Sequence, residues 1–166
     1  MQFFIAALLA ISTIVAAVPA PVPAPAPATV DTSAFEVSNL SIQKVQGTIT
    51  ISFSVHDPNP LTNATEVCKG SWSAGSNDYP KDTYSACGSA FAWNMQSFKS
   101  VRSFQLGLEH AYVDDAVGPP PMNWITNFGH GNVSSDLMSC KTKNGALSCL
   151  QNTPKPIRAT IYASIA

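Results

Sequence analysis

Polar and large apolar side chains alternate without exception in the stretch Thr48-Ile49-Thr50-Ile51-Ser52-Phe53-Ser54-Val55-His56. Successive side chains of a β-strand point to opposite faces, so this pattern places the apolar residues on one face and the polar residues on the other. A register slip of one residue would expose every apolar side chain of the stretch. Strands with one wet face are typical of antiparallel sheets that cover a core. The stretch therefore predicts an all-β protein, either an antiparallel β-barrel or a β-sandwich.

Several other segments carry the same two-residue period. They are Phe35–Gln43, with a phase switch that indicates a bulge near Asn39, and Glu66–Trp72, Phe91–Gln96, Phe104–Glu109 and Ile157–Ile165. No window of twelve or more residues after the N-terminal segment has a helical period. We therefore expect roughly seven to ten strands and little helix.

Connections are predicted from turn chemistry. Asn144-Gly145 is a strong two-residue hairpin signal, and the proline-rich segment Asp114–Pro121 indicates a surface loop. Ser97–Ser103 is expected to be a connection between strands. Trp124–Met138 is expected to hold only a short strand, because Gly129-His130-Gly131-Asn132 resembles a turn.

The chain divides into three parts, which predict a secreted protein with a single domain. Residues 1–17 form an apolar run that ends in small residues, which is typical of a signal peptide, and no bilayer-spanning segment is expected. In residues 18–30 proline alternates with alanine or valine, which predicts an extended, semi-rigid tether. Residues 31–166 are long enough for one domain with its own core.

The charge composition bears on the class of partner. Nine basic and ten acidic residues give a formal net charge of -1, and the basic residues do not cluster along the sequence. Nucleic acids and anionic membranes bind concentrated positive charge, so neither is an expected partner. We expect no cofactor and no metal ion.

The four cysteines predict two disulfides in an oxidising compartment. Three pairings are possible from the sequence. We favour Cys68 with Cys87 and Cys140 with Cys149, because these pairs close the shortest loops. A zinc site is disfavoured because the close CxxC spacing of zinc ligands is absent.

Three sequons make Asn39, Asn63 and Asn132 candidate glycosylation sites, and Asn63 is preferred because it lies in a turn-rich segment.

Motifs for catalysis are weak. The segment Ser71-Trp72-Ser73-Ala74-Gly75 has serine where a nucleophile elbow needs its first glycine. His110 is in phase with the apolar residues of its strand, which favours a structural histidine at the edge of the core. A hydrolase would require a serine or carboxylate within hydrogen-bonding reach of His110 or His130 in a pocket. We expect no enzymatic activity.

The order of these features resembles the Alternaria major-allergen family of secreted fungal β-barrel proteins. The resemblance spans residues 35–166 and rests on the signal, the strand pair Phe35–Val55, the Cys68 strand, Tyr84-Ser85-Ala86-Cys87-Gly88, Phe104–Glu109, the turn between Cys140 and Cys149, and the C-terminal strand. It implies a compact antiparallel barrel or sandwich with two intrachain disulfides. It also implies a non-enzymatic allergen, effector or elicitor that engages plant defence proteins.

One departure from the family concerns oligomerisation. The family's covalent dimer uses a cysteine ahead of the domain, and here none precedes Cys68. A disulfide-linked dimer is therefore not expected.

Two functional hypotheses follow. The first is a secreted fungal effector that docks on a host or cell-wall protein through the loop residues Asp114, Asp115, Pro119, Pro120, Pro121 and Trp124, because a proline-stiffened loop loses little entropy on binding. The second is a carrier of flavonoids or lipids, with an apolar ligand held at a barrel mouth lined by Trp93, Phe104 or Trp124.

Overall fold

A computed structural model describes residues 32–166 of the chain. The predicted signal peptide and tether, residues 1–17 and 18–30, lie outside the described residues. Within the described part, no helix is long and apolar enough to cross a bilayer.

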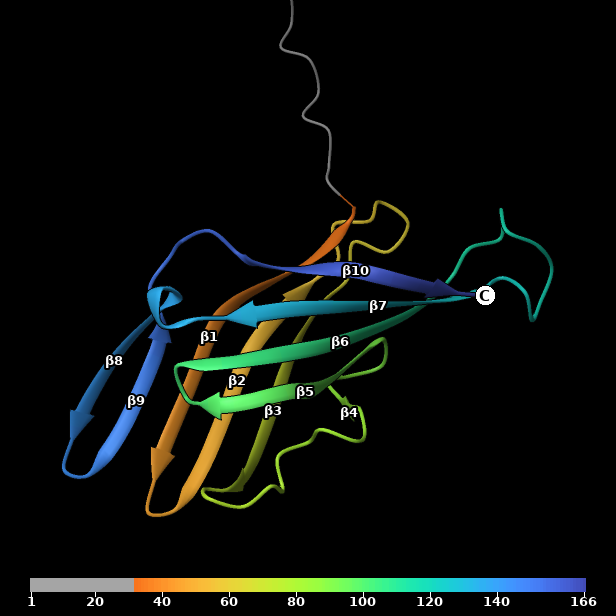
Figure 1. Ribbon diagram of the computed structural model, residues 1–166. Coiled ribbons are helices and arrows are strands. Elements are labelled where there is room, and N and C mark those ends of the chain that lie inside the picture. Colours follow the sequence, from red (N-terminus) through yellow and green to blue (C-terminus); the bar gives the residue numbers. More distant parts are fainter. Residues whose placement is uncertain (1–31) are drawn as a thin grey trace, which may run out of the picture.

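The described chain is an all-β, nearly closed antiparallel barrel with one short 3-10 turn, Ser135–Leu137 (Figure 1). The strands are β1 Ala34–Val45, β2 Thr48–His56, β3 Thr65–Ser73, β4 Ser85–Ala86, β5 Phe91–Ser100, β6 Ser103–Val113, β7 Trp124–Val133, β8 Met138–Lys143, β9 Ala146–Gln151 and β10 Ile157–Ile165. Their order around the sheet is β3-β2-β1-β10-β7-β6-β5-β4, and β9 also pairs with β1 and with β8.

The stretch Thr48–His56 forms β2 with the predicted faces. Ile49, Ile51, Phe53 and Val55 are all buried, whereas the polar residues between them are exposed or half-buried. The same buried face continues through Phe104, Leu106 and Leu108 of β6 and through Ile157 and Ala159 of β10. These apolar faces enclose the core, as the alternation predicted.

The predicted bulge at Asn39 is confirmed. Asn39 has φ of 53°, and the pairing register with β2 shifts between Ser38 and Ser41. The bulge also separates two partners on the other side of β1, because Ala34–Val37 pair with β10 and Ser41–Lys44 pair with β9. A bulge bends its strand, which allows one long strand to serve two sheet edges.

The barrel is closed at its seam by side chains rather than by a strand ladder. β3 and β4 are the two ends of the strand order, and the Cys68–Cys87 disulfide joins β3 to the residue after β4. The second disulfide joins Cys140 to its cross-strand partner Cys149 in the β8–β9 hairpin. Both local pairings predicted from loop length are confirmed.

Two sequence expectations were wrong. The residues 97–103 are not a connection, because β5 continues to Ser100 and β6 begins at Ser103, which leaves a two-residue turn. The cross-strand contact of Phe98 with Phe104 explains the extension, with ring centroids 6.2 Å apart.

The second error concerns β7, which is a full ten-residue strand rather than a short one. Its glycines are not turn residues. A Cβ on Gly129 would lie 2.9 Å from Cδ2 of Phe35, and one on Gly131 would lie 3.2 Å from Cβ of Ala159. These glycines let neighbouring chain segments approach closely. Close approach of this kind is a common reason for glycine within a strand.

Candidate functional site

The predicted docking loop comprises residues 114–123, between β6 and β7, and it projects beyond one end of the barrel (Figure 1). Its base is closed by a hydrogen bond of 2.8 Å from the Asp114 N–H to the carbonyl of Asn123. The Asp114 carboxylate accepts a hydrogen bond from the Ala116 N–H at 3.0 Å, and the Asp115 carboxylate accepts one from the Asn123 side-chain amide at 2.9 Å. The two aspartates therefore hold the loop in shape.

Apolar side chains cover this loop and its exit. Val117, Met122 and Trp124 are 52%, 57% and 56% exposed, and Pro119, Pro120 and Pro121 are also exposed. We call Val117, Met122 and Trp124, with the three prolines, the apolar loop patch. Exposed apolar side chains that lie together on a soluble protein commonly mark an interaction site. Of the six predicted residues, five lie in the loop itself and Trp124 is the first residue of β7 at its exit.

The three sequon asparagines are all exposed. Asn39 occupies the β1 bulge, and Asn63 lies in the β2–β3 turn with φ of 41°. Asn132 lies on β7, where its carbonyl oxygen accepts a hydrogen bond of 2.9 Å from the Gln105 amide. Glycosylation of these residues stays a prediction.

His110 has a carboxylate partner, but the pair is sealed inside the protein. Nδ1 of His110 lies 2.7 Å from Oδ2 of Asp57, and both side chains are 1% exposed. The imidazole stacks on the Phe91 ring with centroids 4.1 Å apart. Neither member of the pair lines the main surface cavities. The hydrogen bond required for catalysis is present without the required pocket, and the arrangement is that of a core-stabilising pair.

The other two histidines also have structural neighbours. Nδ1 of His56 lies 2.9 Å from Oγ1 of Thr65, and the His130 ring stacks on Tyr162 at 4.2 Å. Within residues 32–166, no group of three metal-ligating side chains is arranged around a common point.

The aromatic residues predicted to line a ligand mouth do not come together. Trp93 is fully buried and Phe104 is 3% exposed, and both belong to the core. Trp124 lies instead on the surface of the loop end. Trp93 packs edge-on against Phe53, with ring centroids 5.5 Å apart. The barrel interior around Trp93 is thus occupied by side chains.

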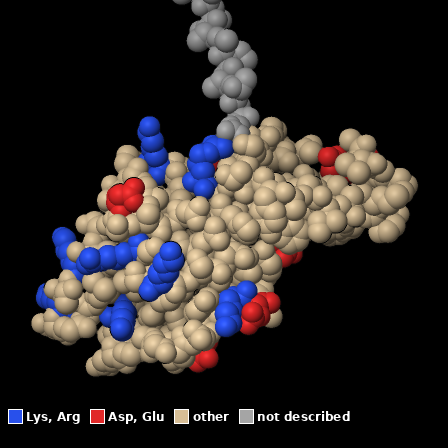
Figure 2. Space-filling view, in the orientation of Figure 1, with Lys and Arg blue, Asp and Glu red and all other residues tan. Residues whose placement is uncertain are grey.

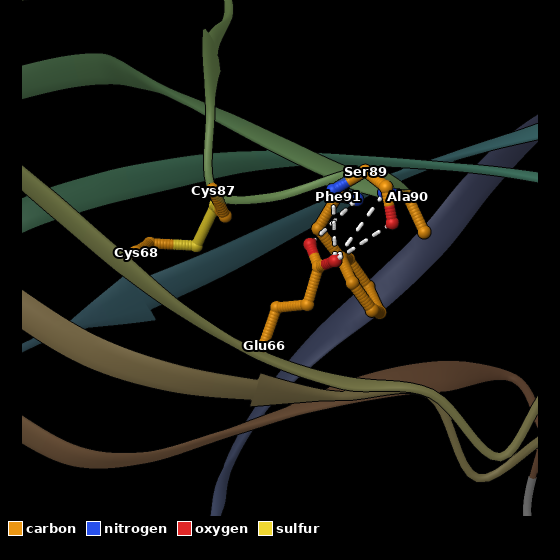
Figure 3. Close-up of a disulfide and its surroundings, with 6 residues drawn as sticks. All are labelled: Glu66, Cys68, Cys87, Ser89, Ala90 and Phe91. Carbon is orange, nitrogen blue, oxygen red and sulfur yellow. Dashed lines mark hydrogen bonds between the residues drawn. A yellow bond between two sulfur atoms is a disulfide. The ribbon is translucent and has the colours of Figure 1, made fainter.

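Glu66 reinforces the barrel seam beside the Cys68–Cys87 disulfide (Figure 3). Its carboxylate accepts hydrogen bonds from the backbone N–H of Ser89 at 2.9 Å and of Phe91 at 3.1 Å. Burial raises the pKa of Glu66, but these backbone hydrogen bonds outweigh it and hold the pKa below its ordinary value.

We expect the stabilisation by Glu66 to depend on pH. Because the folded-state pKa is lowered, the contribution is present above the ordinary value of 4.5 and is lost as the pH falls through the folded value. Glu66→Gln should therefore reduce the free energy of unfolding by on the order of 1 kcal/mol at pH 7, and the difference from wild type should shrink below about pH 4. Urea denaturation from pH 7 to pH 3 measures it. A difference that grows on acidification would contradict the assignment.

Sequence reasoning missed a cavity at the opposite end of the barrel. It has a volume of about 420 Å³ and is lined by Lys44, Trp72, Tyr79, Phe98 and Lys99, among others. The sequence offered one local sign of this cavity. Lys44 lies just before the turn between β1 and β2, and Lys99 lies just before the turn between β5 and β6. Proximity of these turns depends on which strands are neighbours, which the sequence did not show.

Comparison with known proteins places the fold. No family model matches the chain, and no curated protein matches it in sequence. A solved structure, the Alternaria alternata allergen Alt a 1, is similar with a TM-score of 0.51 and 18% identity, and the match covers 84% of this chain and 95% of that chain. The chain therefore has an Alt a 1-like β-barrel fold, and the resemblance seen in the sequence is supported at the level of fold.

Proposed function

We propose that this protein is a secreted, non-catalytic fungal effector that binds a host or cell-wall protein through the apolar loop patch. The observation that carries the proposal is that Val117 and Met122 of one hydrogen-bonded loop, and Trp124 at its exit, are all exposed. Tryptophan in particular is enriched among the residues that dominate interface energies.

The loop is suited to binding because its conformation is already held. The Asp114 and Asp115 hydrogen bonds close it, and three consecutive prolines restrict its backbone. Preorganisation reduces the entropy lost on association, so more of the contact energy appears as affinity. The two disulfides are compatible with an extracellular site of action.

Trp124→Ala tests the proposal. We expect it to weaken binding to a partner captured from plant apoplastic fluid by about 30-fold or more, the loss typical of a central interface tryptophan. Binding of purified protein to the isolated partner is measured by calorimetry, and leaf infiltration measures the defence response.

Leu150→Ala is the matched control, because Leu150 is 54% exposed on β9, away from the loop. This control should retain both binding and the response. Equal binding by Trp124→Ala and wild type would refute the assignment of the loop, and absence of any partner or response across several hosts would refute the effector role.

A further inference from the structure

Six of the nine basic residues are found away from the docking loop, on strands and turns that include the opposite end of the barrel. Figure 2 shows Lys and Arg over the region of the β8–β9 hairpin and the neighbouring strand ends, whereas none appears on the loop end in this view. We use the term basic end for six exposed residues, Lys44, Lys69, Lys99, Arg102, Lys141 and Lys143. They come from five different strands and turns, which is why no cluster is visible along the sequence.

The cations of the basic end form no direct ion pair with a carboxylate. Within the described residues, none of these six side chains has a carboxylate oxygen within 4.0 Å. A Lys or Arg without an internal partner is available to a ligand. The six charges are therefore free of direct ion pairs and contribute a positive field to this surface.

The surface around these cations contains several cavities, and their linings have the same kinds of residue in common. Five cavities of about 190 to 480 Å³ occur on the described chain, and each is lined by at least one residue of the basic end together with serine. No aspartate or glutamate is among the described residues that line them. Lys99 lines two of the cavities, and Ser139 lines two others, so these cavities are neighbours on the surface in pairs.

The cavity of about 420 Å³ adds an aromatic floor to this chemistry. Trp72 packs edge-on against Phe98 with ring centroids 5.4 Å apart, and Tyr79 lies 5.9 Å from Phe98. Lys44 and Lys99 line the same cavity with the hydroxyls of Ser76 and Ser100. An aromatic surface with a few polar groups around it suits a small ring with one apolar face.

We propose that the basic end binds an acidic polysaccharide, with one sugar ring in the aromatic cavity and its carboxylate between Lys44 and Lys99. The uronic acid rings of such a polymer carry hydroxyls for the serine side chains and carboxylates for the lysines. Neighbouring sugars extend over the grooves that contain Lys141 and Lys143 or Lys69. This site is independent of the docking loop.

The lining of the cavities favours a sugar polymer over a nucleic acid. Five of the six cations are lysine, which binds carboxylates and phosphates alike as a point charge, so the cations alone do not select the polymer. Single-stranded nucleic acids stack successive bases on several aromatic side chains, whereas three of the five cavities have no aromatic residue among their described lining residues. The hydroxyl-rich lining matches a sugar polymer instead.

The test is binding of the purified secreted protein to polygalacturonate. Binding is measured by calorimetry or affinity electrophoresis at low and high salt. We expect binding that weakens as salt rises, with no binding to a neutral glucan. Lys44→Gln with Lys99→Gln should reduce affinity by about tenfold or more. Duplex DNA of equal charge should bind more weakly than polygalacturonate.

The control variant carries Lys155→Gln and Arg158→Gln, which removes the same charge from exposed residues that line none of the five cavities. It should lose no more than about threefold in affinity. Equal losses in the two double variants, absence of polygalacturonate binding, or tighter binding to DNA would each overturn the proposal. Both variants replace exposed side chains, so their thermal unfolding should match wild type.

Discussion

Asp57→Ala is expected to lower the free energy of unfolding by about 3 kcal/mol, because it removes the buried hydrogen-bond partner of His110 and of the Asn59 N–H. Asp57 is fully buried, and besides His110 its carboxylate accepts a hydrogen bond of 2.9 Å from the Asn59 N–H. The substitution therefore orphans a buried imidazole and also releases the turn after β2. Urea denaturation at pH 7 measures the loss.

The pH dependence of this effect has a definite sign. Burial raises the pKa of Asp57, but hydrogen bonds from His110 and from the Asn59 backbone outweigh burial and leave the pKa below 3.8. A lowered folded-state pKa means that the stabilisation is present above pH 3.8 and is lost as the pH falls through the folded value. The difference between wild type and Asp57→Ala should thus narrow in strong acid.

A double variant separates pairing from packing. His110→Phe can keep the stacked contact with Phe91 while removing the polar ring. Combined with Asp57→Ala, it should cost less than the sum of the two single variants, because a buried pair can be replaced by apolar groups at little net cost. Additive losses, or a loss below about 1 kcal/mol for Asp57→Ala, would contradict the role of the pair.

Trp93→Ala is expected to cost about 3–5 kcal/mol, the range for removing a large buried aromatic side chain. Trp93 is fully buried, contacts Phe53 edge-on and lies directly over Gly70, where even a Cβ would be 3.0 Å from Cη2 of the indole. The surrounding strands are held by their ladders and cannot close over the space. Thermal and urea unfolding should both show the loss.

Trp93→Phe is the informative comparison. The indole Nε1 is buried without a hydrogen-bond partner among the described residues. Phenylalanine removes this unsatisfied donor, which offsets part of the lost packing. We therefore expect Trp93→Phe to cost less than about half as much as Trp93→Ala. Equal losses in the two variants would contradict this expectation.

Strand identity was largely predictable because its signals are local. The alternation in β2 and β10 and the Asn144-Gly145 hairpin follow from the geometry of neighbouring residues, as did the bulge at Asn39. β7 was not predictable in the same way. Its glycines make room for Phe35 and Ala159, which lie far away in the sequence. Neighbouring residues alone therefore suggested a turn where the chain is in fact a strand.

The candidate sites were likewise predictable only where their signals are local in the sequence. The docking loop was predicted from its prolines, since these exclude regular structure wherever they occur. Its apolar exposure became known only from the fold. The cavity of the basic end was missed because Lys44 and Lys99 line one cavity only after the barrel has formed.

By itself, the sequence determined the antiparallel strands, the tight hairpins and the local disulfide pairs, because side-chain period and turn conformation act over a few residues. Only the tertiary structure decided the Asp57–His110 pair, the neighbours of β1 and the gathering of lysines at one end. These features depend on which distant segments pack together. Packing of that kind follows from the closure of the whole barrel and is not encoded in any single stretch of the chain.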